Sequence, residues 1–151
     1  MKNYEINNNT MALIFNNYKT IIYEKNCRYI VDDLPNKIIK RSCEFFGSSY
    51  KGRVEGTKFL MGINYKSPLI IEESNEIIFF PTASPRINEC SWIRNKYILN
   101  YRRFAKNKCE LMFINGEKIV INYSFETIDN QILRSSRLES IIRYRKSNNF
   151  V

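Results

Sequence analysis

The chain has 151 residues, 44% of them hydrophobic and 14% aromatic, and its 24 Lys and Arg against 15 Asp and Glu give a net charge of +9. A chain of this size and composition folds around a core of its own, so we expect one domain over residues 1–151. The sequence contains no histidine, which removes the usual general base near neutral pH and the Ser–His and Cys–His nucleophile pairs. An enzyme is therefore the least favoured class.

The cysteines and the N-terminus indicate the compartment. The four cysteines, at positions 27, 43, 90 and 109, form no C-x-x-C pair, so we expect no metal site and no cofactor. The N-terminus does not resemble a signal peptide, and no stretch approaches the roughly 20 apolar residues of a membrane span. We expect a cytoplasmic, nucleoid-associated protein with reduced cysteines and no membrane partner. A secreted basic protein with two disulfides is the alternative.

The first part of the chain predicts β-structure followed by a helix. The two β-rich runs are Thr10–Phe15 and Thr20–Val31. The pair Asp32-Asp33 stands before Pro35, an order typical of a helix start. Apolar residues on one face predict a helix over Asn36–Phe46, and Gly47 suits the position just past its end.

Residues 47–62 form a glycine-rich segment that holds four of the five glycines. Hydroxyl and cationic side chains lie between these glycines: Ser48, Ser49, Tyr50, Lys51, Arg53, Thr57 and Lys58. Glycine allows close approach of the backbone to a ligand, and such side chains bind phosphate, although no Walker motif is present. A tight polar connection between a helix and a strand is the alternative.

The rest of the chain predicts further strands and a final helix. The expected strands are Pro68–Glu72, Glu76–Pro81, Ser91–Ile93, Lys96–Phe104, Leu111–Ile114 and Lys118–Tyr123, with a loop over Thr82–Glu89. Asn115-Gly116 is a strong hairpin signal, and Thr127–Tyr144 has the periodicity of an amphipathic helix. These elements predict an α+β fold: a mainly antiparallel β-sheet with a central helix and a C-terminal amphipathic helix.

The charge is unevenly distributed. From residue 94 onward the chain carries twelve basic residues against five acidic ones. A basic domain with concentrated charge favours a polyanion, namely DNA, RNA or an anionic membrane face. A solubilising surface is the alternative reading.

Several segments together carry a family resemblance. They are RSCEFFGSSYKGRVEGT (Arg41–Thr57), YKSPLIIEESNEIIFFPT (Tyr65–Thr82), CSWI (Cys90–Ile93), INYSFE (Ile121–Glu126) and NQILRSSRL (Asn130–Leu138). The first is specific, because it is seventeen residues of unusual composition. Over most of its length, from about residue 25 to 142, the chain resembles the ComK family of competence transcription factors.

The resemblance implies a transcriptional activator that binds paired A-rich and T-rich boxes in double-stranded DNA, largely through the minor groove, as a homodimer or higher oligomer. It also implies an adaptor that delivers the protein to a Clp protease. Family members continue for a few dozen residues after the last helix, in a tail with an adaptor-recognition segment. This chain ends at Val151, so the resemblance leaves open its adaptor control and its pairing of dimers.

Cations on mobile or glycine-rich backbone suit a minor-groove reader, because A-tracts narrow that groove and strengthen its negative potential. The predicted DNA-binding residues are Arg41, Ser48, Ser49, Lys51, Arg53, Lys58, Arg94, Lys96, Arg102 and Arg103, with Lys51 and Arg53 the leading candidates. Arg102 and Arg103 are expected on opposite faces of a sheet, so that one of them suffices. Ser48 and Ser49 would alternatively close the turn after Gly47.

Two other functions compete with the activator. One is a shortened ComK-like interaction protein that modulates a full-length regulator or its adaptor without activating transcription itself. The other is an RNA or single-strand binder. It would use aromatic side chains as stacking platforms, although we expect these in the core: Phe45, Phe46, Phe79, Phe80 and Trp92.

Overall fold

The computed structural model describes residues 3–148 and has two sheets and three α-helices. The strands are β1 (Thr10–Asn16), β2 (Lys19–Glu24), β3 (Arg28–Val31), β4 (Leu69–Glu72), β5 (Ile77–Pro81), β6 (Trp92–Arg94), β7 (Ile98–Ala105), β8 (Lys108–Phe113) and β9 (Lys118–Ile121). The helices are α1 (Pro35–Phe45), α2 (Tyr50–Met61), the 3₁₀ turn η1 (Asn95–Tyr97) and α3 (Phe125–Asn148). This confirms the α+β class. Among the described helices none is long and apolar enough to cross a membrane.

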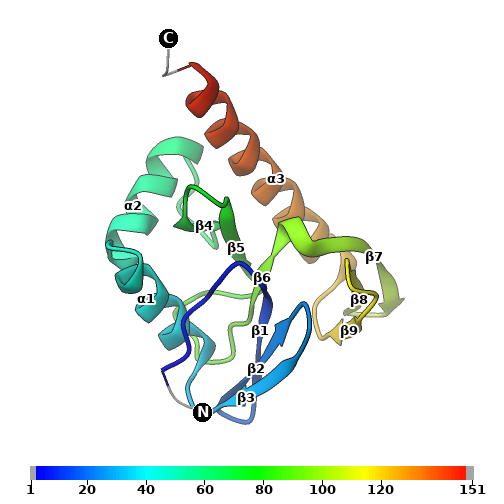
Figure 1. Ribbon diagram of the computed structural model, residues 1–151. Coiled ribbons are helices and arrows are strands. Elements are labelled where there is room, and N and C mark those ends of the chain that lie inside the picture. Colours follow the sequence, from blue (N-terminus) through cyan, green and yellow to red (C-terminus); the bar gives the residue numbers. More distant parts are fainter. Residues whose placement is uncertain (1–2, 149–151) are drawn as a thin grey trace.

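Every neighbouring pair of strands is antiparallel. The first six strands form one sheet in the order β3-β2-β1-β6-β5-β4, and the last three form a second sheet in the order β7-β8-β9 (Figure 1). Strand β6 pairs with both β1 and β5, so Leu13 lies opposite Trp92 although they are far apart in the sequence. Strand β6 therefore lies inside the six-stranded sheet and joins β1 to β5.

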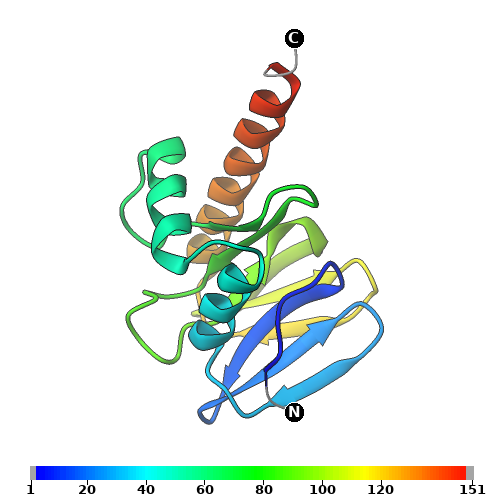
Figure 2. The ribbon, with the colours of Figure 1, turned by 60° about the vertical axis from the view of Figure 1, so that its left-hand side comes forward.

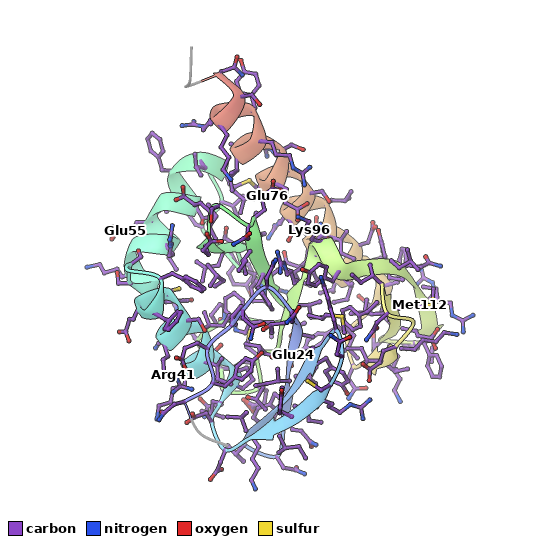
Figure 3. All side chains as sticks on the ribbon, in the orientation of Figure 1. Glu24, Arg41, Glu55, Glu76, Lys96 and Met112 are labelled. Atoms are coloured by element: carbon purple, nitrogen blue, oxygen red, sulfur yellow. The ribbon has the colours of Figure 1, made fainter. Side chains whose placement is uncertain are left out.

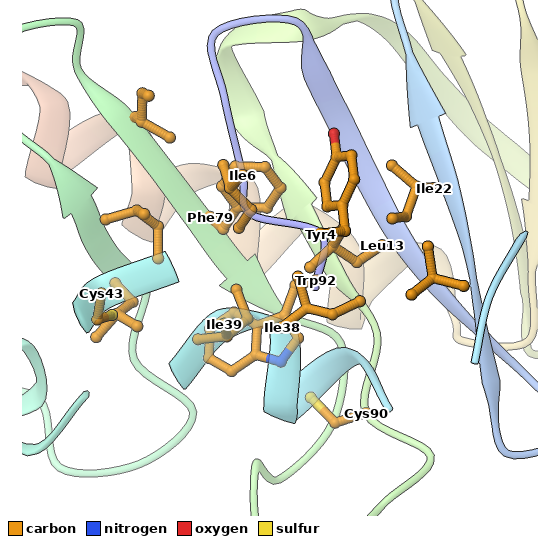
Figure 4. Packing of buried hydrophobic residues seen from close by; sticks show 14 of the residues in the cluster. Tyr4, Ile6, Leu13, Ile22, Ile38, Ile39, Cys43, Phe79, Cys90 and Trp92 are labelled. Atoms are coloured by element: carbon orange, nitrogen blue, oxygen red, sulfur yellow. The ribbon is translucent and has the colours of Figure 1, made fainter. Parts of the chain in front are cut away.

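Both faces of the six-stranded sheet are buried at β5 and β6. On one face Phe79 and Trp92 pack with Ile38 and Ile39 of α1 (Figure 4). On the opposite face other side chains of β5 and β6 pack with β8, β9 and the start of α3, including Phe80, Ile93, Leu111, Phe113 and Ile128. Burial on both faces explains why β5 is apolar along its whole length.

Helix α3 contacts both the three-stranded sheet and helix α2. Near its start Tyr101 Oη of β7 donates a 2.6 Å hydrogen bond to Asp129 Oδ1. Further along, Leu138 and Ile142 of α3 pack with Met61 of α2 in a third apolar cluster. Figure 2 shows the C-terminal part of α3 extending upward beside α2.

The glycine-rich segment departs most from the sequence prediction, because residues 50–61 form α2 and not a connecting loop. Ser49 is its N-cap, and Ser49 Oγ accepts a 3.0 Å hydrogen bond from the backbone N of Gly52. Gly62 ends the helix in the left-handed conformation, with φ +70°. Thr57 and Met61 are buried, and Tyr50 and Val54 on the same face are half-buried against the core, so the helix has a narrow inward face.

Other predictions also need correction. The run Thr20–Val31 is two strands, β2 and β3, and residues 95–97 form η1 before β7 begins. The pair Asp32-Asp33 does not cap α1, because the N-cap is Leu34 and has no side-chain cap bond. Phe45, expected in the core, is 64% exposed. The four cysteines are free, so the two-disulfide alternative does not hold.

Candidate nucleic-acid interface

Four of the arginines predicted to contact DNA form ion pairs with carboxylates. The partners are Asp33 for Arg41 (3.0 Å), Glu73 for Arg53 (3.0 Å), Glu110 for Arg102 (2.8 Å) and Glu126 for Arg103. Figure 3 labels Arg41 on α1; it also donates to the backbone carbonyl of Tyr4. The hydrogen bond from Arg103 lowers the pKa of the Glu126 carboxyl. Each of these arginines already has a carboxylate partner in the free protein.

Arg102 and Arg103 lie on opposite faces of the three-stranded sheet, as expected from their neighbouring positions. Arg102 pairs with Glu110 on the adjacent strand β8, whereas Arg103 reaches Glu126 on α3. Arg103 also lies over the Phe125 ring, at 5.3 Å from its centroid. One polyanion could contact at most one of the two arginines from a given side.

Arg94 has no exposed surface, which is inconsistent with the prediction that it contacts DNA. Its guanidinium donates to the backbone carbonyls of Asn8 (3.1 Å) and Asn75 (3.0 Å) and lies over the Tyr97 ring. Burial lowers the pKa of this guanidinium. Because β6 lies between β1 and β5, Arg94 joins the N-terminal segment to the β4–β5 turn. Its role is structural.

The remaining predicted residues divide into two kinds. Ser49 caps α2, and the half-buried Ser48 donates through its backbone N to Cys43 O at 3.0 Å, so both serve the chain reversal between α1 and α2. Lys51, Lys58 and Lys96 are exposed and form no ion pair within residues 3–148. Figure 3 labels Lys96 between β6 and β7, away from α1. The fold therefore does not gather the predicted cations on one surface.

The fold does build one concave basic surface, which we call the α1–α2 groove. This cavity of about 800 Å³ lies between α1, α2, the segment 63–69, the segment 84–88 and Trp92. Five cationic residues line it: Lys37, Lys40, Lys58, Lys66 and Arg86. The lining within the described chain includes no Asp or Glu. Lys37 pairs with Asp33 at 3.7 Å, on the neighbouring turn of the chain.

Aromatic side chains form part of the groove wall. Lys40 Nζ lies 5.7 Å from the centroid of the Tyr50 ring, and Lys66 Nζ lies 5.9 Å from that of Tyr65. Both are cation–π distances, which hold the ammonium groups near the wall without neutralising their charge. A concave site with one sign of charge focuses the field and attracts anions. The groove is thus suited to bind phosphate groups.

Sequence reasoning missed four of the five groove cations: Lys37, Lys40, Lys66 and Arg86. Lys37 and Lys40 are three residues apart in the predicted helix Asn36–Phe46, a spacing that places them on one face. This spacing could have identified Lys37 and Lys40 as a pair of cations on one helix face. Nothing in the local sequence connects Lys66 and Arg86 with α1, because the fold alone brings these segments together.

The two sheets, the three helices and the groove define a basic α+β protein with a concave, cation-lined surface. The chain belongs to the ComK protein family, whose model matches residues 1–147. It is similar to the competence transcription factor of Bacillus subtilis (strain 168), with 33% identity over 144 residues, covering 93% of this chain and 75% of that protein. No solved structure matches the chain.

Proposed function

We propose that this protein is a DNA-binding transcriptional activator of the competence type, which recognises paired A-rich and T-rich boxes largely through the minor groove. It acts as a single ComK-like domain in the cytoplasm, associated with the nucleoid, and as a homodimer or higher oligomer on DNA. Its partners include an adaptor of a Clp protease. The family match and the competence transcription factor among its relatives support the class.

The observation that carries the proposal is the α1–α2 groove. Lys40, Lys58, Lys66 and Arg86 line it without an ion pair in the described part of the chain. When a cation of the protein that has no internal partner contacts a phosphate, it displaces the counterions condensed on the DNA. The release of these counterions drives association with duplex DNA. An arginine already paired with a carboxylate must first lose that partner. The groove is therefore favoured over the ion-paired arginines of β7.

Minor-groove readout fits a surface of this kind. In the minor groove A·T and T·A present the same acceptors, so a protein reads A·T content and groove width there. A narrow groove at A-tracts attracts inserted Arg or Lys. Such recognition needs no helix in the major groove, and α1 lines its groove with lysine side chains.

The test is a binding titration on three duplexes. One carries A-rich and T-rich boxes, one has inosine·cytosine in place of the A·T pairs of the boxes, and one has mixed sequence. The inosine swap keeps the minor-groove pattern but changes the major groove, so the first two duplexes should bind alike and the third more weakly. Equal binding to all three would contradict sequence-selective recognition, and selective loss on the inosine duplex would indicate major-groove contacts.

A further inference from the structure

Arg86 differs from most of the other arginines in its surroundings. Eight described arginines donate to a carboxylate or to a backbone carbonyl: Arg28, Arg41, Arg53, Arg94, Arg102, Arg103, Arg134 and Arg143. Within residues 3–148, Arg86, Arg137 and Arg145 have no such side-chain contact. Of these three only Arg86 lines the α1–α2 groove.

The backbone around Arg86 is a closed turn. Ile87 N donates to Ser84 O at 3.1 Å, and Ser84 Oγ accepts from Arg86 N at 3.3 Å. Pro85 occupies the second position of the turn, where its ring fixes φ. A second bond, from Cys90 N to Ile87 O at 3.4 Å, continues the turn toward β6. Arg86 thus stands at the tip of a constrained backbone segment.

One side chain holds this turn against the rest of the fold. Asn36 Nδ2 donates to Pro85 O and to Ile87 O, both at 2.9 Å, on either side of Arg86. Asn36 Oδ1 accepts a 2.8 Å hydrogen bond from Trp92 Nε1. Trp92 belongs to β6 and is 1% exposed, so it is fixed in the core. The Asn36 carboxamide uses its acceptor and both donors to join β6, α1 and the turn.

We propose that Arg86 is the arginine that enters the DNA minor groove, and that Asn36 is the residue that positions it. This inference rests on the proposed function. The lysines of the α1–α2 groove then meet phosphates, which are the same in every sequence, whereas Arg86 senses groove width and A·T content. Because the turn is fixed before binding, its backbone loses little conformational entropy when the guanidinium is inserted.

The first test compares Arg86→Gln with Arg137→Gln. Both remove one exposed, unpaired positive charge, but Arg137 lies on α3 and does not line the groove. The quantity measured is the ratio of Kd for a G·C-substituted duplex to Kd for the A/T-box duplex. Arg86→Gln should reduce this ratio about tenfold, because its partner lies at the bases, and Arg137→Gln should leave it unchanged. An unchanged ratio in Arg86→Gln would overturn the assignment.

The second test isolates positioning. Asn36→Asp keeps the acceptor for Trp92 and removes both donors to the turn, while adding one negative charge. The matched control is Asn88→Asp, which adds the same charge to the same groove at a side chain for which the described structure has no hydrogen bond. Asn88→Asp should weaken all duplexes alike. Asn36→Asp should also lower the ratio of Kd for the G·C-substituted duplex to Kd for the A/T-box duplex. This loss of selectivity should disappear when Asn36→Asp is combined with Arg86→Gln.

The outcomes separate the two levels of the proposal, with thermal melting used to confirm that each variant is folded. If the parent protein does not discriminate between the duplexes, the proposed function fails. If the parent discriminates and Arg86→Gln does too, only the role of Arg86 fails. If Arg86→Gln loses discrimination while Asn36→Asp behaves like Asn88→Asp, the positioning role of Asn36 is overturned.

Discussion

Arg53 Nη1 lies 3.0 Å from Glu73 Oε1, and this ion pair ties α2 to the turn between β4 and β5. The Arg53 side chain is only 18% exposed, and its Nε is buried without a hydrogen-bond partner in the described structure. Sequence composition and family resemblance both made Arg53 a leading candidate for DNA contact. Its geometry indicates a residue that helps to dock α2 on the sheet.

Replacing Arg53 with Ala should therefore affect stability more than DNA selectivity. The expected loss is about 1 kcal/mol of unfolding free energy, because the aliphatic stem loses its packing and the ion pair is partly exposed. That corresponds to a fall in Tm of about 2–4 °C, measured by thermal melting. A variant that melts like the parent but loses preference for the A/T-box duplex would return Arg53 to the DNA interface.

Arg94 should be among the most sensitive positions of the fold. Arg94→Ala removes a fully buried side chain and its hydrogen bonds to the Asn8 and Asn75 carbonyls, of which, within the described structure, only Asn8 O keeps another donor, Tyr97 Oη, and we expect a loss of about 3 kcal/mol or more. Arg94→Lys should not restore stability, because an ammonium lacks the planar fork that reaches both carbonyls. Denaturant unfolding of the parent and both variants checks this. A lysine variant as stable as the parent would show that charge alone is required.

Glu139 of α3 should make stability depend on pH. Burial raises the pKa of its carboxyl, against the opposing effects of Arg143, Asn95 and Lys96, and Oε2 has no hydrogen-bond partner in the described structure. A carboxyl whose pKa is higher in the folded than in the unfolded state binds its proton more tightly when folded. Its ionised form therefore costs stability at neutral pH, and this cost fades as the pH falls through the folded-state pKa.

Glu139→Gln has the same shape without the charge, so it should melt above the parent at pH 7. The difference in Tm should shrink as the pH is lowered toward about 4, where the parent carboxyl also becomes protonated. Thermal melting at both pH values measures this. If the glutamine variant melts lower at pH 7, the carboxylate contributes net stability through Arg143 and Lys96.

The sequence predicted the strands and the two amphipathic helices well, and missed α2 for a physical reason. β5 is an unbroken apolar run, and the chain between β8 and β9 carries the Asn115-Gly116 signal. In α2 the glycines lower the intrinsic helix propensity, and the exposed Phe59 obscures the narrow apolar face of Tyr50, Val54 and Met61. The N-cap at Ser49, the packing of Tyr50 and Val54 on the core beside α1, and the packing of Met61 on α3 hold that helix.

The candidate site was harder to predict because it is assembled from distant segments. Lys40, Lys66 and Arg86 come from α1 and from two loops, and no local pattern links them. Arg94 shows the opposite error. In the sequence Arg94 follows a short apolar run, where a charged residue is usually exposed. In the structure it belongs to β6, an inner strand of the sheet, and its guanidinium donates to backbone carbonyls. Charge counting alone does not distinguish these two cases.

The most direct test of the α1–α2 groove compares two triple variants by their salt dependence on the A/T-box duplex. Lys40→Gln/Lys58→Gln/Lys66→Gln removes three groove lysines. Lys106→Gln/Lys108→Gln/Lys118→Gln removes three exposed lysines from β8, β9 and the turn between β7 and β8, and is matched in charge.

The parent should show a slope of log K against log salt of about −5 to −9 if six to ten phosphates are neutralised. The groove variant should lose about 2.7 of that slope for each copy bound, because about 0.9 is lost with every missing phosphate contact. The sheet variant should keep the parent slope. If instead the sheet variant loses slope and the groove variant does not, DNA binds at the three-stranded sheet and the assignment of the groove is wrong.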